Sequence, residues 1–147
     1  MYKVIRLLTE EEKNQALKIR EEVFVNEQNV PIELEIDELD SVNSTVHVGL
    51  YYKDIMIATG RILDAGTSTI HLGRIAVLKN YRGTGLGKKL VLGMEEIAKE
   101  LTESNVTSFL SAQLYAEKFY QSLGYIRENN NIYLDAGIEH VDMFKKL

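Results

Sequence analysis

The chain has 147 residues, of which 45% are hydrophobic and 27% charged, and its formal net charge is −5 at pH 7. These values are typical of one globular domain spanning residues 1–147, and the acidic balance argues against a general nucleic-acid binder. The absence of cysteine excludes disulfides, thiolate metal sites and a cysteine nucleophile. The histidines, His47, His71 and His140, lie far apart without the spacing of metal ligands, so we expect no metal.

The first predicted elements are a strand and an amphipathic helix. Residues 3–8 favour a strand, and Thr9 with Glu12 three residues later matches the capping box that starts a helix. Apolar residues at helical spacing follow from Ala16 to Val23 and predict one buried helix face. The N-terminus is too charged for a signal peptide, and no apolar run is long enough to cross a membrane. We therefore expect a cytoplasmic protein without membrane contact.

An acidic stretch, residues 33–40, follows shortly after Pro31. Charged runs of this kind are usually solvated loops, which is one interpretation. The other interpretation is a lip that faces the substrate, with the carboxylates of Asp37 and Asp40 at its end. At this point in the chain both interpretations stay open.

The middle of the chain predicts an antiparallel hairpin followed by a further strand. Residues 45–52 alternate apolar and other side chains, Lys53 and Asp54 make a turn, and residues 55–63 return. After another loop, residues 69–78 predict a strand that ends in four consecutive apolar residues, which suits a central position in a sheet.

A glycine-rich turn follows this strand and opens a helix predicted from Gly85 to about Glu100. Glycines recur at alternate positions over Gly83–Gly87, and apolar residues at helical spacing continue from Leu86. Such a turn directs free backbone N–H groups and the positive end of the helix dipole to one place. Arg82 and Lys88 add positive charge. We therefore predict a phosphate cradle; the alternative is that the glycines only cap and pack a tight turn.

The glycine pattern does not match the two commonest phosphate-binding motifs. A P-loop needs Ser or Thr after its lysine, but Lys89 follows Lys88, and Arg82 occupies the position of its first glycine. The dinucleotide fingerprint fails because the glycines run Gly-x-Gly-x-Gly and the strand lies in mid-chain. The arrangement Arg82-x-x-Gly85-x-Gly87 after an apolar strand resembles the pyrophosphate-binding motif of the GNAT superfamily of N-acetyltransferases, whose donor is acetyl-CoA.

A second GNAT-like segment follows a strand predicted at residues 106–110. Residues 111–125 predict a helix with an aromatic stripe that includes Tyr115 and Phe119, and such stripes usually belong to the core. The string from Ala116 to Tyr125, Ala-x-x-Phe-Tyr-x-x-Leu-Gly-Tyr, is similar to the GNAT segment beside the CoA thiol. This resemblance implies that Tyr120 is the general acid that protonates the leaving thiolate. The alternative is a hydroxyl that only satisfies a buried hydrogen bond.

The tail predicts two short strands around a turn at Asp135 to Gly137. Its run Asp-Ala-Gly-Ile-x-His, ending at His140, resembles the C-terminal end of the ElaA-like GNAT subgroup. The run Val-Phe-Val-x-Glu-Gln-Asn-Val-Pro, ending at Pro31, resembles the N-terminal segment of the same subgroup and favours the substrate-facing lip. His140 is a candidate for acceptor binding or proton transfer, although a lone histidine is more often structural.

The resemblance covers nearly the whole chain and implies an α/β GNAT fold. We expect a mixed sheet of six or seven strands with flanking helices, an antiparallel N-terminal half, and central parallel strands that splay apart at one end. Pantetheine would lie in the splay and bind the backbone as an added strand. The implied acetyl-CoA-binding residues are Ile75, Ala76, Val77, Arg82, Gly83, Thr84, Gly85, Leu86, Gly87 and Lys88.

The implied activity is transfer of an acetyl group from acetyl-CoA directly to a primary amine, with both substrates bound together. A base must accept the proton of the amine, and a backbone N–H near Ile75 is the expected oxyanion donor. Many GNAT enzymes carry a catalytic glutamate on the central strands, but residues 70–77 contain no acid. Glu27, Asp37, His140 or a water chain is left as the base. The alternatives are a non-catalytic acyl-CoA-binding or sensor domain and a structural domain without CoA; exposed strand edges favour a homodimer.

Overall fold

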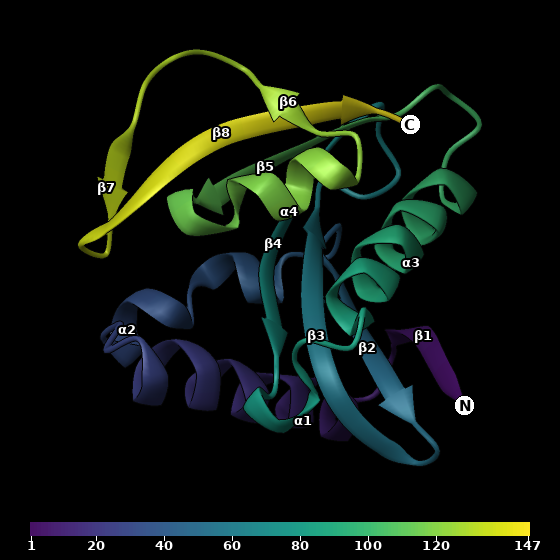
Figure 1. The fold of residues 1–147 in the computed structure, drawn as a ribbon. Helices are drawn as coiled ribbons and strands as arrows, with labels where there is room; N and C mark the ends of the chain where they lie inside the picture. Colours follow the sequence, from purple (N-terminus) through teal and green to yellow (C-terminus); the bar gives the residue numbers. More distant parts are fainter.

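The computed structural model describes residues 1–147 as one mixed sheet with helices on both faces (Figure 1). The elements in chain order are β1 (Tyr2–Leu7), α1 (Glu10–Arg20), the π-helical η1 (Glu21–Glu27), α2 (Ile32–Glu35), the 3-10 turn η2 (Glu38–Ser41), β2 (Val46–Tyr52), β3 (Ile55–Leu63), β4 (Thr69–Val77), the 3-10 turn η3 (Lys79–Tyr81), α3 (Leu86–Glu100), β5 (Thr107–Gln113), the 3-10 turn η4 (Leu114–Ala116), α4 (Glu117–Ser122), β6 (Ile126–Arg127), β7 (Tyr133–Asp135) and β8 (Ile138–Lys146).

The sheet has the order β1-β2-β3-β4-β5-β8-β6. Strand β7 pairs with the first residues of β8, from Ile138 to His140, whereas β6 pairs further along it, at Met143 and Phe144. Strands β1 to β4 are antiparallel, whereas β4 and β5 run parallel on either side of the α3 crossover. The predicted mixed sheet with an antiparallel N-terminal half is confirmed. It has eight strands instead of six or seven because β6 and β7, of two and three residues, are too short to give a sequence pattern.

Two apolar clusters hold the helices against the sheet. Helix α3 buries Leu86, Leu90, Met94 and Ala98 in the larger cluster, which confirms the predicted apolar face. Helix α1 packs in the smaller cluster with residues of β1, β3 and β4. The two helices therefore cover different parts of the core, and β4 lies between them with one end near the start of α3 (Figure 1).

The predicted capping box at the start of α1 is confirmed. The Glu12 amide donates to Thr9 Oγ1 at 3.1 Å, and the Thr9 amide donates to Glu12 Oε1 at 3.0 Å. Two backbone N–H groups at the helix start are thereby satisfied. Helix α1 then continues without a break into η1, so that Arg20 lies inside a long helical segment.

The prediction for residues 111–125 is wrong in part. Strand β5 extends to Gln113 because its last residues pair with β8, and the helix that follows is short. The expected core position of Tyr115 is incorrect, because its side chain is 79% exposed. Strand β8 also runs for nine residues, longer than the short strand expected in the tail.

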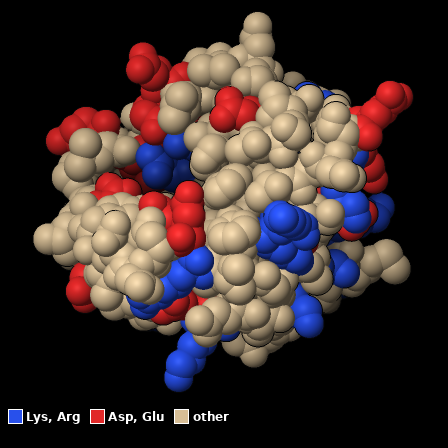
Figure 2. Space-filling view, turned by 90° about the horizontal axis from the view of Figure 1, so that it is seen from above, with Lys and Arg blue, Asp and Glu red and all other residues tan.

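Figure 2 shows how the charged side chains are distributed over one face of the molecule. On that face Lys and Arg side chains are scattered among acidic and neutral residues and form no continuous basic patch. None of the helices combines the length and apolar character that a membrane span requires.

Candidate active site

The two parallel strands separate at the middle of the sheet, as predicted. Strands β4 and β5 pair only over Thr69–Leu72 and Thr107–Leu110. Beyond this point β5 stays with β8, while β4 stays with β3 as far as Val77. The β4 edge from Gly73 to Val77 therefore has no strand beside it on the β5 side, and Figure 1 shows the two strands diverging. An unpaired strand edge can bind an extended ligand through its backbone.

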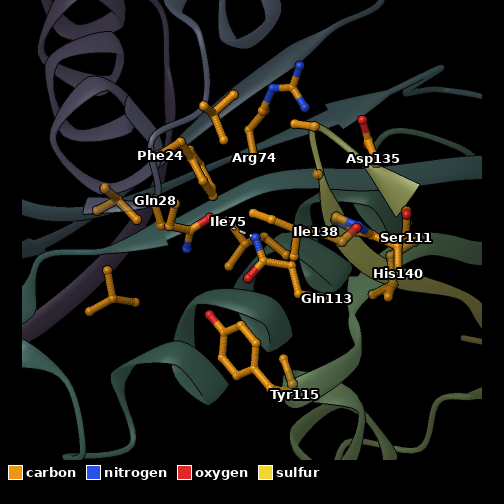
Figure 3. A pocket seen from close by; sticks show the side chains of 18 of the residues that line it. Phe24, Gln28, Arg74, Ile75, Ser111, Gln113, Tyr115, Asp135, Ile138 and His140 are labelled. Carbon is orange, nitrogen blue, oxygen red and sulfur yellow. Dashed lines mark hydrogen bonds between the residues drawn. The ribbon is translucent and has the colours of Figure 1, made fainter. Parts of the chain in front are cut away.

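A cavity of about 530 Å³ opens at this separation (Figure 3). Its walls come from η1 and α2, from β4, from β5 with η4 and α4, and from the turn between β7 and β8. The polar residues that line it are Gln28, Glu35, Arg74, Arg82, Ser111, Gln113, Tyr115, Tyr120, Asp135 and His140. Segments from both ends of the chain thus meet at one site.

The glycine turn presents free N–H groups at the β4 end of this cavity. No backbone N–H from Gly83 to Lys88 donates to any acceptor in the protein. Gly83 and Gly85 have φ of 79° and 82°, and a Cβ atom on either would meet nothing within 4 Å. The turn is therefore open on its outer side, as a diphosphate group requires. Only Gly87 has a packing role, because its Cβ would lie 3.3 Å from Phe119.

Arg82 joins the turn to η1. Its guanidinium donates to both carboxylate oxygens of Glu27, at 2.8 and 3.0 Å, and its Nε donates to the Val77 carbonyl at 2.8 Å. Glu27 does not line the cavity, and its carboxylate is occupied by this pair. The positive charge of Arg82 is balanced there, whereas Lys88 is exposed and makes no ion pair.

A β-bulge interrupts the ladder between β3 and β4 beside the cavity. Thr59 pairs with Ala76 but Arg61 pairs with Gly73, so that Arg74 and Ile75 face a single residue of β3. Arg74 has φ of 51°, in the left-handed region that side chains other than glycine rarely adopt. Bulges leave backbone polar groups unpaired and redirect side chains. Both consequences place polar groups of β4 at the cavity wall.

The acidic stretch is a solvated loop only in part, because Glu33 and Glu38 are exposed whereas Glu35 is buried. Arg20, which is 1% exposed, donates from Nε to Glu35 Oε2 at 2.7 Å and from its terminal nitrogens to the Asp40 carboxylate at 2.7 and 3.1 Å. It also donates to the Glu35 carbonyl at 2.7 Å. Burial opposes ionisation of Asp40, but Arg20 and Arg61 outweigh it and lower the pKa of that carboxyl to about 2. Glu35 and Asp40 therefore belong to a largely buried ion network.

Two further arginines complete the network. Arg61 donates to Asp37 and Asp40 at 2.8 and 2.9 Å, and Arg74 lies 3.2 Å from both Glu35 Oε2 and Asp37 Oδ2. Hydrogen bonding from Arg61 lowers the pKa of Asp37, whereas burial raises the pKa of Glu35 despite its arginine partners. Of the three acids only Glu35 lines the cavity.

Tyr120 and His140 both lie on the cavity wall. The Tyr120 hydroxyl makes no hydrogen bond within the protein, and burial raises the pKa of Tyr120 to about 12, which keeps it protonated. The buried tyrosine hydrogen bond belongs to Tyr125, whose hydroxyl lies 2.8 Å from Ser108 Oγ and 2.9 Å from Glu95. His140 Nδ1 lies 2.7 Å from the Ile138 carbonyl, which leaves Nε2 without a protein partner.

A hydrogen bond from Gln113 Nε2 to Gln28 Oε1, 2.8 Å long, links β5 to η1 across the cavity. In Figure 3, Arg74 and Tyr115 lie on opposite sides of this bond. No sequence pattern selects either glutamine, Glu35 or Arg74 as a site residue. Gln28 carried a weak signal, because it lies in the run that ends at Pro31.

Comparisons with known proteins agree with this geometry. The family model of the acetyltransferase (GNAT) domain matches residues 7–147. YyaT of Bacillus subtilis (strain 168) is 41% identical over 144 residues, which are 97% of this chain and 94% of YyaT. ElaA of Escherichia coli (strain K12) is 31% identical over 134 residues, 89% of this chain and 85% of ElaA.

Solved structures show the same fold. The crystal structure of Escherichia coli ElaA superposes with a TM-score of 0.87 and 28% identity, covering 99% of this chain and 100% of that one. An aminoglycoside 6'-N-acetyltransferase complexed with coenzyme A has a TM-score of 0.69 at 14% identity, covering 98% and 96% of the two chains, and shares the fold alone.

Proposed function

The chain belongs to the GNAT acetyltransferase family, and we propose that it transfers an acetyl group from acetyl-CoA directly to a primary amine. The observation that carries this proposal is the open β4 edge, which leads from the cavity to the free N–H groups of the glycine turn. One extended ligand with an anionic end fits both features. A reactive end of that ligand would then lie in the cavity, beside Tyr120.

The proposed binding mode follows the sequence expectations residue by residue. The N–H groups of Gly83 to Lys88 would hold the diphosphate, and the backbone of Ile75 to Val77 would pair with the pantetheine arm. Lys88 supplies the unbalanced positive charge at this end, because Glu27 neutralises Arg82. The fit is supported by the open space outside Gly83 and Gly85.

The acceptor nitrogen must lose two protons, one before and one after it bonds to the acetyl carbon, and the thiolate must gain one. The acceptor ammonium must lose a proton before its nitrogen can form a bond to the thioester carbonyl carbon, because alkylammonium groups have a pKa of about 10. When the carbon–sulfur bond breaks, the departing thiolate must gain a proton. The Tyr120 hydroxyl, protonated and without a protein partner, is the proposed donor. The sequence has no cysteine to carry the acyl group, which favours direct transfer with both substrates bound together.

A non-catalytic acyl-CoA-binding or sensor domain is the second candidate function. It is favoured by the lack of any acidic residue on β4, the strand that carries the catalytic glutamate in many GNAT enzymes. The two functions differ in turnover. An enzyme releases CoA thiol from acetyl-CoA when its amine is added, whereas a sensor binds acetyl-CoA without releasing thiol.

Thiol release from acetyl-CoA tests the proposed function. The panel comprises butylamine, spermidine, glucosamine, L-lysine and trialanine, which represent alkylamines, polyamines, amino sugars, amino acids and peptide N-termini. We expect at least one of these amines to raise thiol release above the rate without amine, and mass spectrometry to show the N-acetyl product. Acetyl-CoA binding without acetylation of any panel amine would favour the sensor.

Replacing Tyr120 with Phe is expected to lower kcat by roughly 100-fold, because the leaving thiolate loses its proton donor. Acetyl-CoA affinity should stay within about twofold of wild type, since the removed hydroxyl makes no hydrogen bond in the protein. Steady-state kinetics with the best panel amine measures the effect. Tyr115→Phe is the matched control, because Tyr115 lines the same cavity but is exposed. Equal kcat values for the two variants would exclude Tyr120 as the acid.

The expectations of a cytoplasmic protein and of a homodimer stay predictions. The same holds for Glu27 and His140 as catalytic residues. Of these two, only His140 lines the cavity.

A further inference from the structure

The site contains a buried carboxylate that the sequence did not select. Glu35, at the end of the four-residue helix α2, is 3% exposed and lines the cavity. Its Oε2 is held by Arg20 Nε at 2.7 Å and by Arg74 Nε at 3.2 Å. Its Oε1 has no hydrogen-bond partner in the protein. The one side-chain atom that is both fully buried and unpartnered is Arg61 Nε. Glu35 Oε1 is therefore not fully buried, and Glu35 is one of the residues that line the cavity.

The main chain around Glu35 is fixed against the bulge of β4. Arg74 Nε donates to the Glu35 carbonyl, and a terminal nitrogen of Arg74 donates to the Leu34 carbonyl, both at 3.2 Å. These contacts hold the Glu35 carboxylate beside the β4 residues at which the open edge begins. Nearby cavity walls are apolar, from Phe24, Val30 and Leu34. In such apolar surroundings the electrostatic attraction between a cation and a carboxylate is stronger than in water.

We propose that Glu35 binds the ammonium group of the acceptor through Oε1 and accepts its proton, which makes Glu35 the general base of the reaction. This inference rests on the proposed acetyl transfer. The proton moves from the amine nitrogen to Oε1, the nitrogen lone pair forms the bond to the acetyl carbon, and the thiolate leaves with a proton from Tyr120. The bonded nitrogen still carries two protons, and it loses one of them through solvent to restore the Tyr120 hydroxyl. Glu35 then returns its own proton to solvent, so that charge and protons balance over one turnover.

The ion network suits this role. Before the reaction three arginines face three carboxylates, so the net charge of the network is zero. Burial raises the pKa of Glu35, which makes its carboxylate a stronger proton acceptor, while the hydrogen bond from Arg20 and the charge of Arg74 oppose this rise. A protonated Glu35 leaves the network with one unbalanced positive charge at the cavity wall, which would favour an oxyanion formed in the cavity.

The other candidate bases are less well placed. Both oxygens of Glu27 bond to Arg82, and Glu27 lies outside the cavity lining. Both oxygens of Asp37 also accept hydrogen bonds, from Arg61, Arg74 and the Leu39 amide, and Asp37 is absent from the lining as well. His140 lines the cavity with Nε2 free, so it is the competing base in the experiment.

The test compares Glu35→Gln with two matched variants. Glu33→Gln removes the same charge from an exposed position of the same helix, and His140→Gln removes the competing base. Thermal unfolding and acetyl-CoA titration first establish that each variant is folded and binds the donor. The specificity constant kcat/KM is then measured at pH 7.0 and pH 9.5 for the panel amine that wild type acetylates fastest.

We expect Glu35→Gln to lower kcat/KM at pH 7.0 by at least about 100-fold, with acetyl-CoA affinity within about twofold of wild type. At pH 9.5 more of the amine is already neutral, so the deficit should shrink by about tenfold. A purely structural defect would give the same deficit at both pH values. The groups that face Glu35 are Arg20, Arg61 and Arg74, which stay charged, and Asp37 and Asp40, whose lowered pKa values lie far below this range. Glu33→Gln should match wild type.

Each other outcome overturns the inference. Glu35 is not the base if Glu35→Gln has an unchanged kcat/KM or shows the same deficit at both pH values. It is also not the base if the pH-dependent deficit appears in His140→Gln instead. These outcomes leave the acetyltransferase proposal intact. Acetylation of no panel amine by wild type would overturn the proposed function and this inference together. If Glu35→Gln does not fold, Glu35→Asp replaces it, because aspartate keeps the charge but withdraws the carboxylate oxygens. Its loss of kcat/KM must then be smaller at pH 9.5 than at pH 7.0.

Discussion

Arg20→Met is expected to lower the free energy of unfolding by about 3–5 kcal/mol, the cost of removing one partner from a buried ion pair. Arg20 is 1% exposed and donates to the carboxylates of Glu35 and Asp40 as well as to the Glu35 carbonyl. Methionine fills similar volume but leaves two largely buried carboxylates without this partner. Urea unfolding at pH 7 measures the loss, which would be a large fraction of the stability of a domain of this size.

Lys99→Met is the matched control for this prediction. Lys99 pairs with Glu96 on the surface of α3, with side chains 49% and 65% exposed, so its removal should cost about 0.5 kcal/mol or less. A similar small change for Arg20→Met would mean that the network contributes little to stability.

Acid unfolding provides a second test of the network. The lowered pKa of Asp40, about 2, stabilises the folded state at neutral pH, and this contribution is lost as pH falls from about 4 towards 2.

Features with a local signal in the sequence were predicted closely. The apolar spacing after Gly85 predicts a helix to about Glu100, and α3 spans Leu86–Glu100. The Thr9 capping box, the hairpin of β2 and β3, and the glycine turn also depend on neighbouring residues alone. The splay between β4 and β5 came from the family resemblance, because no single strand carries a sign of where its pairing stops.

The rest depends on contacts between distant segments. In the sequence nothing distinguishes Glu35 from the other acids of the stretch. Its burial and ion pairs depend on Arg20, Arg61 and Arg74, which come from α1, β3 and β4. The bulge at Arg74 needs the β3 register, which the sequence of β4 does not contain. Tyr115 was expected in the core because the helical period was applied to residues that in fact continue strand β5 and a 3-10 turn.

Gly85→Glu is expected to weaken acetyl-CoA binding by at least about 100-fold, because a carboxylate within about 4 Å of the diphosphate costs several kcal/mol near a protein surface. The added side chain also fills the open space outside the turn. Gly85 has φ of 82°, so any side chain there adds backbone strain. Gly66→Glu carries the same charge and similar strain, at φ of 87°, in the loop before β4 and outside the cavity lining.

Calorimetric titration of acetyl-CoA into wild type, Gly85→Glu and Gly66→Glu tests the central claim that the glycine turn holds the donor. We expect one binding site per chain with micromolar affinity for wild type and Gly66→Glu, and no detectable heat of binding for a folded Gly85→Glu. Binding of equal affinity by all three proteins, or by none of them, would contradict it. The turn would then be only the start of α3.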